Sequence, residues 1–179
     1  MAKRLSVEGF YVNTMDLLTT LTEIYKEYDV KIEKKEDDVS FIIINPVGDD
    51  NIEILIENYY DGFELTFIFS FYHNHFDEDI DGLINYINDF IQGKVTVYAF
   101  YCEERMVVAN STYKKHIDIS SSESIIRCLS DDVIMFGFGQ YGEDISYYDW
   151  FFNKLKGFNN CCSFRQWDST KNKDINFTI

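Results

Sequence analysis

Two histidines, His73 and His75, have the residue type and spacing that best suit metal chemistry in this chain. Residues two apart on a strand point to the same side, so both imidazoles could meet one metal ion, with Asp77 or Asp79 close by. A zinc site needs a third protein ligand, and the remaining histidine is His116. If the alternation of the preceding strand continues, the pair instead lies on its core-side face and makes hydrogen bonds there. We therefore predict no metal ion and no cofactor.

A glycine run at 137–142, Gly-Phe-Gly-Gln-Tyr-Gly, formally matches the G-x-G-x-x-G pattern of dinucleotide sites and follows an apolar stretch. Such a site also needs a helix directly afterwards and an acidic residue about 20 positions on. That position lies near Cys162 and holds no carboxylate. The glycines are better explained as residues of bulges or tight turns.

The adjacent thiols Cys161 and Cys162 could form a redox pair or supply a nucleophile. Nothing basic precedes them and no histidine lies close in sequence, so we expect structural thiols. Carboxylates are abundant enough to hide a catalytic pair, for example among residues 33–38 or 77–81. A solvated acidic surface predicts the same clusters, and we predict no catalytic residue and no enzymatic activity.

The charge of the chain is its strongest overall signal: 31 acidic residues face 16 basic ones, a net charge of −15. Because 46% of the residues are hydrophobic and 17% aromatic, this is a folded body and not a solvated acidic tail. Such a body repels nucleic acid and anionic membranes and attracts cationic partners. We expect neither nucleic acid nor a membrane as partner.

Periodicity predicts the elements that must position these residues. Apolar positions at helical spacing predict a helix over 13–28, capped by Asn13 or Thr14, a second over 77–91 that Gly93 ends, and a short third one over 120–129. Strands are predicted over 39–45, 52–58, 63–72, 95–102, 105–109, 133–138 and 161–167.

Consecutive strands on short turns favour an α+β fold with a mainly antiparallel sheet and two to three helices packed on one face. We expect a single domain over 1–179. Its segment 153–179 carries a net charge of +3 and either folds back on the acidic body or is loosely attached. No run reaches the roughly 18 apolar residues that cross a bilayer, and no signal peptide is recognisable. The sequence therefore predicts a cytoplasmic protein.

The stretch Ile52–Tyr101 combines an apolar strand, the turn Tyr60-Asp61-Gly62, an aromatic strand ending in His73-Asn74-His75-Phe76-Asp77, an amphipathic helix and the strand Lys94–Tyr101. This arrangement resembles small acidic immunity proteins of bacterial contact-dependent growth inhibition and related polymorphic-toxin systems. The resemblance implies a cytoplasmic protein that binds and neutralises the C-terminal domain of one cognate toxin. Many such toxins are basic nucleases, which an acidic inhibitor suits by charge.

The expected contact residues are acids and aromatics near predicted turns. They are Tyr59, Tyr60, Asp61, Glu103, Glu104, Asp131 and Asp132. Two alternatives stay open. One is an adaptor or scaffold protein without catalysis, and the less favoured one is a metal-dependent hydrolase that uses His73 and His75.

Overall fold

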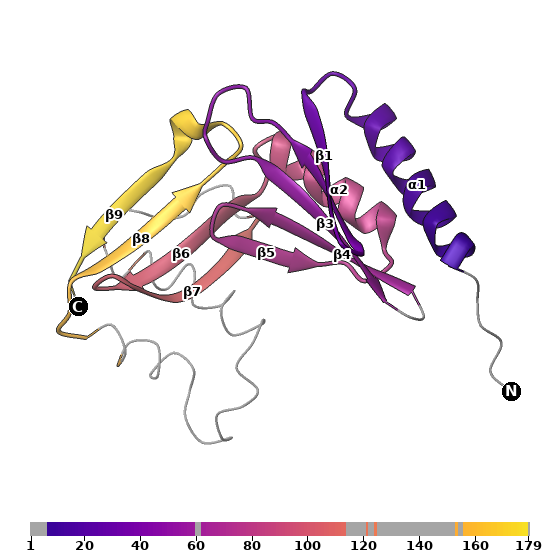
Figure 1. Ribbon diagram of the computed structural model, residues 1–179. Helices are drawn as coiled ribbons and strands as arrows, with labels where there is room; N and C mark the ends of the chain where they lie inside the picture. Colours follow the sequence, from indigo (N-terminus) through magenta and orange to yellow (C-terminus); the bar gives the residue numbers. More distant parts are fainter. Residues whose placement is uncertain are drawn as a thin grey trace, which may run out of the picture. The chain divides into compact units, whose positions relative to one another are not determined.

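The computed structural model describes residues 7–59, 62–113 and 156–178, together with the single residues 121, 124 and 153 (Figure 1). Contacts within the backbone divide the chain into two compact units, Met1–Ile87 and Asn88–Ile179. Each unit is built around its own antiparallel sheet.

The first unit begins with helix α1 (Val7–Ile24) and continues as a five-stranded meander. Its strands, in order along the chain and across the sheet, are β1 (Val30–Lys35), β2 (Asp38–Ile43), β3 (Ile52–Tyr59), β4 (Gly62–Phe69) and β5 (Tyr72–His75). Every neighbouring pair is antiparallel. Helix α2 (Ile80–Ile91) follows and carries the chain into the second unit.

Alternation of side chains along β2, β3 and β4 builds the core of the first unit. Phe41, Ile54 and Phe67 face each other across the three strands and are fully buried. Each helix makes a side-chain contact with a residue of this sheet. Thr14 of α1 donates a hydrogen bond from Oγ1 to Oδ1 of Asn58 at 3.2 Å, and the ring of Tyr86 on α2 lies 5.0 Å from that of Phe67.

The second unit has a four-stranded antiparallel sheet of order β7-β6-β8-β9. Its strands are β6 (Thr96–Cys102), β7 (Arg105–Thr112), β8 (Asn160–Arg165) and β9 (Lys173–Phe177), with the short 3-10 helix η1 (Ser169–Lys171) before β9. A cluster of buried side chains covers one face of this sheet: Tyr98, Phe100, Cys162, Phe164 and Phe177. Residues 160–177 of the basic tail are therefore folded into the sheet, and β8 pairs directly with β6.

The coarse prediction of an α+β fold with antiparallel strands is confirmed, but the strands form two sheets instead of one. The sequence could not show this, because nothing in it states which hairpins pair with each other. Strands β1 and β9 were not predicted, since Lys and Glu interrupt the apolar pattern of β1 and Lys and Asp that of β9. The strand 133–138 and the glycine run 137–142 lie outside the described residues, as does the predicted helix 120–129 apart from the single residues 121 and 124.

The helix starts differ from prediction for local reasons. Helix α1 begins at Val7, so Thr14 is a buried residue of its interior and not a cap. Helix α2 begins at Ile80, because Asp77 has a positive φ of 43° and the Asp79 carboxylate accepts a hydrogen bond from the Gly82 backbone N–H at 2.9 Å, as a capping residue does. The predicted stop at Gly93 is confirmed by its φ of 71°.

Candidate functional site

Negative charge is concentrated in the first unit. Residues 1–87 contain 19 acidic and 6 basic residues, a net charge of −13, whereas residues 88–179 contain 12 and 10, a net of −2. The acidic character therefore belongs to the unit that holds α1 and the meander. An electrostatic partner surface is to be sought there first.

The carboxylates of β2–β4 lie on one face of the five-stranded sheet. Because Ile52, Ile54 and Ile56 point into the core, the residues that alternate with them on β3, namely Glu53, Leu55, Glu57 and Tyr59, must point to the opposite side. We call this side the acidic face and define it by Asp38, Glu53, Glu57 and Glu64. The half-buried side chains Ile42, Leu55 and Ile68 share this face.

Glu57 and Glu64 are directly opposite each other in the β3–β4 register. Like charges in such a cross-strand pair repel and destabilise the sheet. Tyr59, which follows on the same side of β3, is 50% exposed. The charge of Glu57, with smaller contributions from Glu64 and Asp38, raises the pKa of the Tyr59 hydroxyl above its ordinary value. The predicted contact residue Tyr59 is thus part of a concentrated negative potential.

Polar contacts hold several side chains of this face in place. Ser40 donates a hydrogen bond from Oγ to Oε1 of Glu53 at 2.5 Å. Glu64 contacts Nδ1 of His75, and the same ring nitrogen lies 3.1 Å from Oγ1 of Thr66. At the sheet edge, Glu33 of β1 contacts Lys31, so the excess of negative charge lies over β2–β4.

His73 and His75 are exposed, so the expectation that they lie on the core-side face is wrong. The chain reverses at Ser70, whose φ is 55°, and Phe69 pairs with Tyr72. This two-residue reversal places His73 and His75 opposite Ile68 and Thr66, away from the core. Their rings lie 5.2 Å apart, but within the described residues no group of three His, Cys, Asp or Glu side chains could hold a metal ion.

Two further predicted contact residues, Glu103 and Glu104, form the exposed turn between β6 and β7. Glu103 has a φ of 55°, and its backbone N–H donates a hydrogen bond to the carbonyl of Asn159 at 2.7 Å. They belong to the second unit and Tyr59 to the first. The remaining predicted contact residues, Tyr60, Asp61, Asp131 and Asp132, lie outside the described residues.

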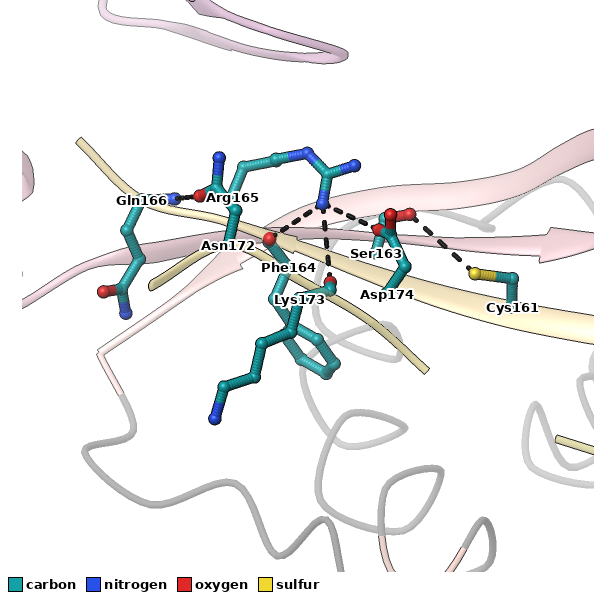
Figure 2. Close-up of polar contacts among 8 residues, drawn as sticks. All are labelled: Cys161, Ser163, Phe164, Arg165, Gln166, Asn172, Lys173 and Asp174. Carbon is teal, nitrogen blue, oxygen red and sulfur yellow. Dashed lines mark hydrogen bonds and ion pairs between the residues drawn. The ribbon is translucent and has the colours of Figure 1, made fainter. Parts of the chain in front are cut away.

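A row of polar side chains crosses β8 and β9 in the second unit (Figure 2). The Arg165 guanidinium donates hydrogen bonds to the carboxylate of Asp174 at 2.7 Å and to the carbonyl of Phe164 at 3.0 Å. The bond from Arg165, together with one from Ser163, lowers the pKa of Asp174 although partial burial opposes it. Cys161 lies at the end of the row, with Sγ 4.0 Å from Oγ of Ser163.

Cys162, the neighbour of Cys161, lies on the opposite side of β8. Cys162 is fully buried there, and burial raises the pKa of its thiol well above the ordinary value. The charge of Asp174 is held by Arg165, and within the described part of the second unit no histidine is present to act as a base. Cross-strand pairing accounts for the contacts of this row, and the expectation that both thiols are structural stays a prediction.

Sequence reasoning missed Glu53, Glu57 and Glu64 as surface candidates because it looked for acids near turns. The signal was present: each alternates with buried apolar residues on a strand, and a period of two sends it to the side opposite the core.

No family model, curated protein or solved structure matches this chain. Within the described residues, no helix combines the length and apolar character needed to cross a membrane. The resemblance to immunity proteins therefore stays a prediction.

Proposed function

We propose that this protein is an immunity protein that binds a basic toxin domain, a nuclease-type one, and neutralises it by occlusion. The observation that carries the proposal is the acidic face, where Asp38, Glu53, Glu57 and Glu64 project from three adjacent strands of a unit with a net charge of −13. The inhibitor performs no chemistry. Its carboxylates occupy the groove that the toxin uses for phosphates.

Charge and apolar area are combined on this face in a way that suits a protein partner. Ile42, Leu55 and Ile68 are half-buried among the carboxylates, so a partner that covers them removes apolar surface from water. Carboxylates around such a centre steer a cationic domain toward it and set its orientation. Tyr59 adds an exposed aromatic side chain of the kind that is enriched in interfaces.

The repulsion between Glu57 and Glu64 favours the binding of a cationic side chain. Two carboxylates opposite each other repel in the free sheet, and a Lys or Arg side chain placed between them replaces this repulsion by two attractions. A partner thus gains more from this pair than from two separated carboxylates. The same repulsion disfavours a purely structural role for the pair.

The placement of the helices supports an accessible acidic face. The contacts of Thr14 with Asn58 and of Tyr86 with Phe67 lie on the core side of the sheet, and in our proposal both helices pack on that one face. The protein acts in the cytoplasm of the cell that it protects. An adaptor or scaffold protein would need no basic partner. The following experiment distinguishes that role from the inhibitor role.

The test is affinity capture on the immobilised full chain from the cells that make it, followed by elution with salt. We expect a basic protein domain to be released as the salt concentration rises, because screening weakens the attraction. Expressed alone, that domain should arrest growth, and co-expression with this chain should restore it. Capture of a domain that is harmless alone, or one whose toxicity persists on co-expression, would refute the inhibitor function.

A further inference from the structure

The second unit contains a hollow of about 880 Å³ at one end of its sheet. Three stretches supply the described residues that line it: the turn Glu103–Arg105, the segment Asn159–Cys161 that enters β8, and Asn176–Thr178 at the end of β9. The hollow thus lies where three neighbouring strands, β6, β8 and β9, start or end. Nothing in the proposed function uses it.

The walls of the hollow are held in place by backbone contacts. The Glu103 N–H donates to the Asn159 carbonyl at 2.7 Å, and Asn160 is paired with both Cys102 and Phe177 across the sheet. The Phe177 ring is 6% exposed and meets Phe100 edge to face, at 6.2 Å between ring centres. A ligand would therefore meet a preformed site and would not have to order it.

The volume of the hollow decides what size of ligand fits. Sites for small molecules typically measure about 300–1,000 Å³, so this hollow is large enough for a peptide segment of a few residues. A single metal ion would leave it nearly empty, and the described residues contain no metal-binding group of three.

The side chains of the hollow decide the charge of the ligand. Glu103 and Glu104 are both exposed at one wall, and Arg105 is the one cation among the described lining residues. Asn159 and Asn176 add side-chain amides, which both donate and accept hydrogen bonds, as the peptide backbone requires. An anionic ligand would be repelled by the excess of carboxylate, whereas Lys and Arg side chains pair with it.

We propose that this hollow binds a short cationic peptide segment. A Lys or Arg side chain of the segment pairs with Glu103 and Glu104, and the amides of Asn159 and Asn176 hold its backbone. The Arg105 guanidinium, which can only donate hydrogen bonds, donates one to a backbone carbonyl of the ligand. The site lies in the second unit and is independent of the acidic face, so either can exist without the other.

The probe for this site is the dipeptide acetyl-Arg-Arg-amide, titrated into the ¹⁵N-labelled full chain and followed by amide chemical shifts. We expect saturable shifts concentrated at residues 103–105, 159–161 and 176–178. The variant with both Glu103→Gln and Glu104→Gln should bind about fivefold more weakly or worse, because two exposed charge pairs are lost. Acetyl-Gln-Gln-amide should produce no saturable shifts.

The matched control carries Asp49→Asn and Asp50→Asn, which remove the same charge from a loop of the first unit. It should bind the dipeptide as the wild type does. Equal weakening in both variants, or shifts spread over all exposed carboxylates, would overturn the proposal by showing non-specific attraction only. An unchanged spectrum away from the substituted residues shows that the variants remain folded. Toxin binding at the acidic face is a separate measurement and is unaffected by either result.

Discussion

Glu57 on β3 and Glu64 on β4 are direct cross-strand partners, two carboxylates placed opposite each other in the sheet register. The arrangement costs stability in the free protein. Glu64 also contacts His75, while Glu57 acts on the hydroxyl of Tyr59, so the pair connects the acidic face from β5 to the end of β3. In our proposal, the repulsion between these two carboxylates lowers the stability of the free protein and favours the binding of a cationic partner.

Replacement of one member of the pair should stabilise the free protein. Glu57→Gln removes the repulsion and keeps the side-chain shape, and we expect a gain of about 0.2–1 kcal/mol in the free energy of unfolding. Urea denaturation at low salt measures it. High salt should reduce the difference, since it screens the repulsion in the wild type. Asp16→Asn, an exposed change on α1, is the control. A loss of stability in Glu57→Gln would contradict the repulsion.

The Tyr59 hydroxyl reports the potential of the acidic face directly. The charge of Glu57 is the largest cause of its raised pKa, so Glu57→Gln should move that pKa down toward the ordinary 10.0. Ultraviolet difference titration of each protein against its Tyr59→Phe counterpart isolates this tyrosine from the others. Added salt should act in the same direction in the wild type. An identical Tyr59 titration in both proteins would show that Glu57 does not act on it.

The Arg165–Asp174 contact should stabilise the folded protein at neutral pH and lose this effect in acid. The pKa of Asp174 is lowered in the folded protein, so its contribution is present above the unfolded value, near 3.8, and is lost as the pH falls through the lower folded value. Arg165→Gln should cost up to about 1 kcal/mol at neutral pH, because the carboxylate is largely exposed. The control Lys173→Gln removes an exposed charge on β9.

Urea denaturation of both variants between neutral and acid pH makes this comparison. The deficit of Arg165→Gln relative to the wild type should shrink as the pH falls below 3.8, whereas Lys173→Gln should show no such trend. A deficit that persists unchanged in acid would assign the effect to the bonds from Arg165 to the backbone carbonyls and not to Asp174.

The two adjacent thiols should differ in reactivity. Cys162 is fully buried and its pKa is raised, whereas Cys161 is half-buried on the other side of β8. At about pH 8.5, iodoacetamide should modify Cys161 about tenfold faster or more, because the thiolate is the reactive form. Fragmentation mass spectrometry separates the two sites. In urea both thiols are exposed and should react at similar rates. Equally similar rates in the native protein would contradict the burial of Cys162.

Much of the fold followed from local patterns. The alternation from Phe63 to Phe71 predicted a strand over 63–72, of which the part up to Phe69 is found as β4. The helical spacing up to Ile91, with Gly93 behind it, predicted the end of α2. The reversal at Ser70 was missed because serine is not a strong turn signal and the aromatic alternation runs on to Phe71. That one reversal moved His73 and His75 from the predicted core side to the surface.

The candidate surface was harder to predict than the strands. Tyr59 was expected at the site from its position before a turn, but Glu57 and Glu64 become neighbours only once β3 and β4 pair in a defined register. Register depends on which face is buried and on the turn between the strands, and several acids along two strands allow many pairings. Division into two sheets likewise depends on the long-range pairing of β8 with β6.

The most direct test of the central claim uses the captured basic domain and three forms of this chain. One is the wild type, one carries Glu53→Gln, Glu57→Gln and Glu64→Gln on the acidic face, and the control carries Asp16→Asn, Glu27→Gln and Asp29→Asn. Each variant replaces three carboxylates by amides, so both differ from the wild type by the same charge. All three control residues are exposed. Calorimetric affinities are measured at about 0.1 M and about 1 M salt, between which the screening length falls from about 10 Å to about 3 Å.

At low salt we predict that the acidic-face variant binds at least about tenfold more weakly than the wild type, and that the control loses less than about threefold. At high salt the gap between the two variants should narrow. Equal losses in both variants would show that only the net charge matters. A wild-type affinity that does not change with salt would contradict an electrostatic role for the acidic face.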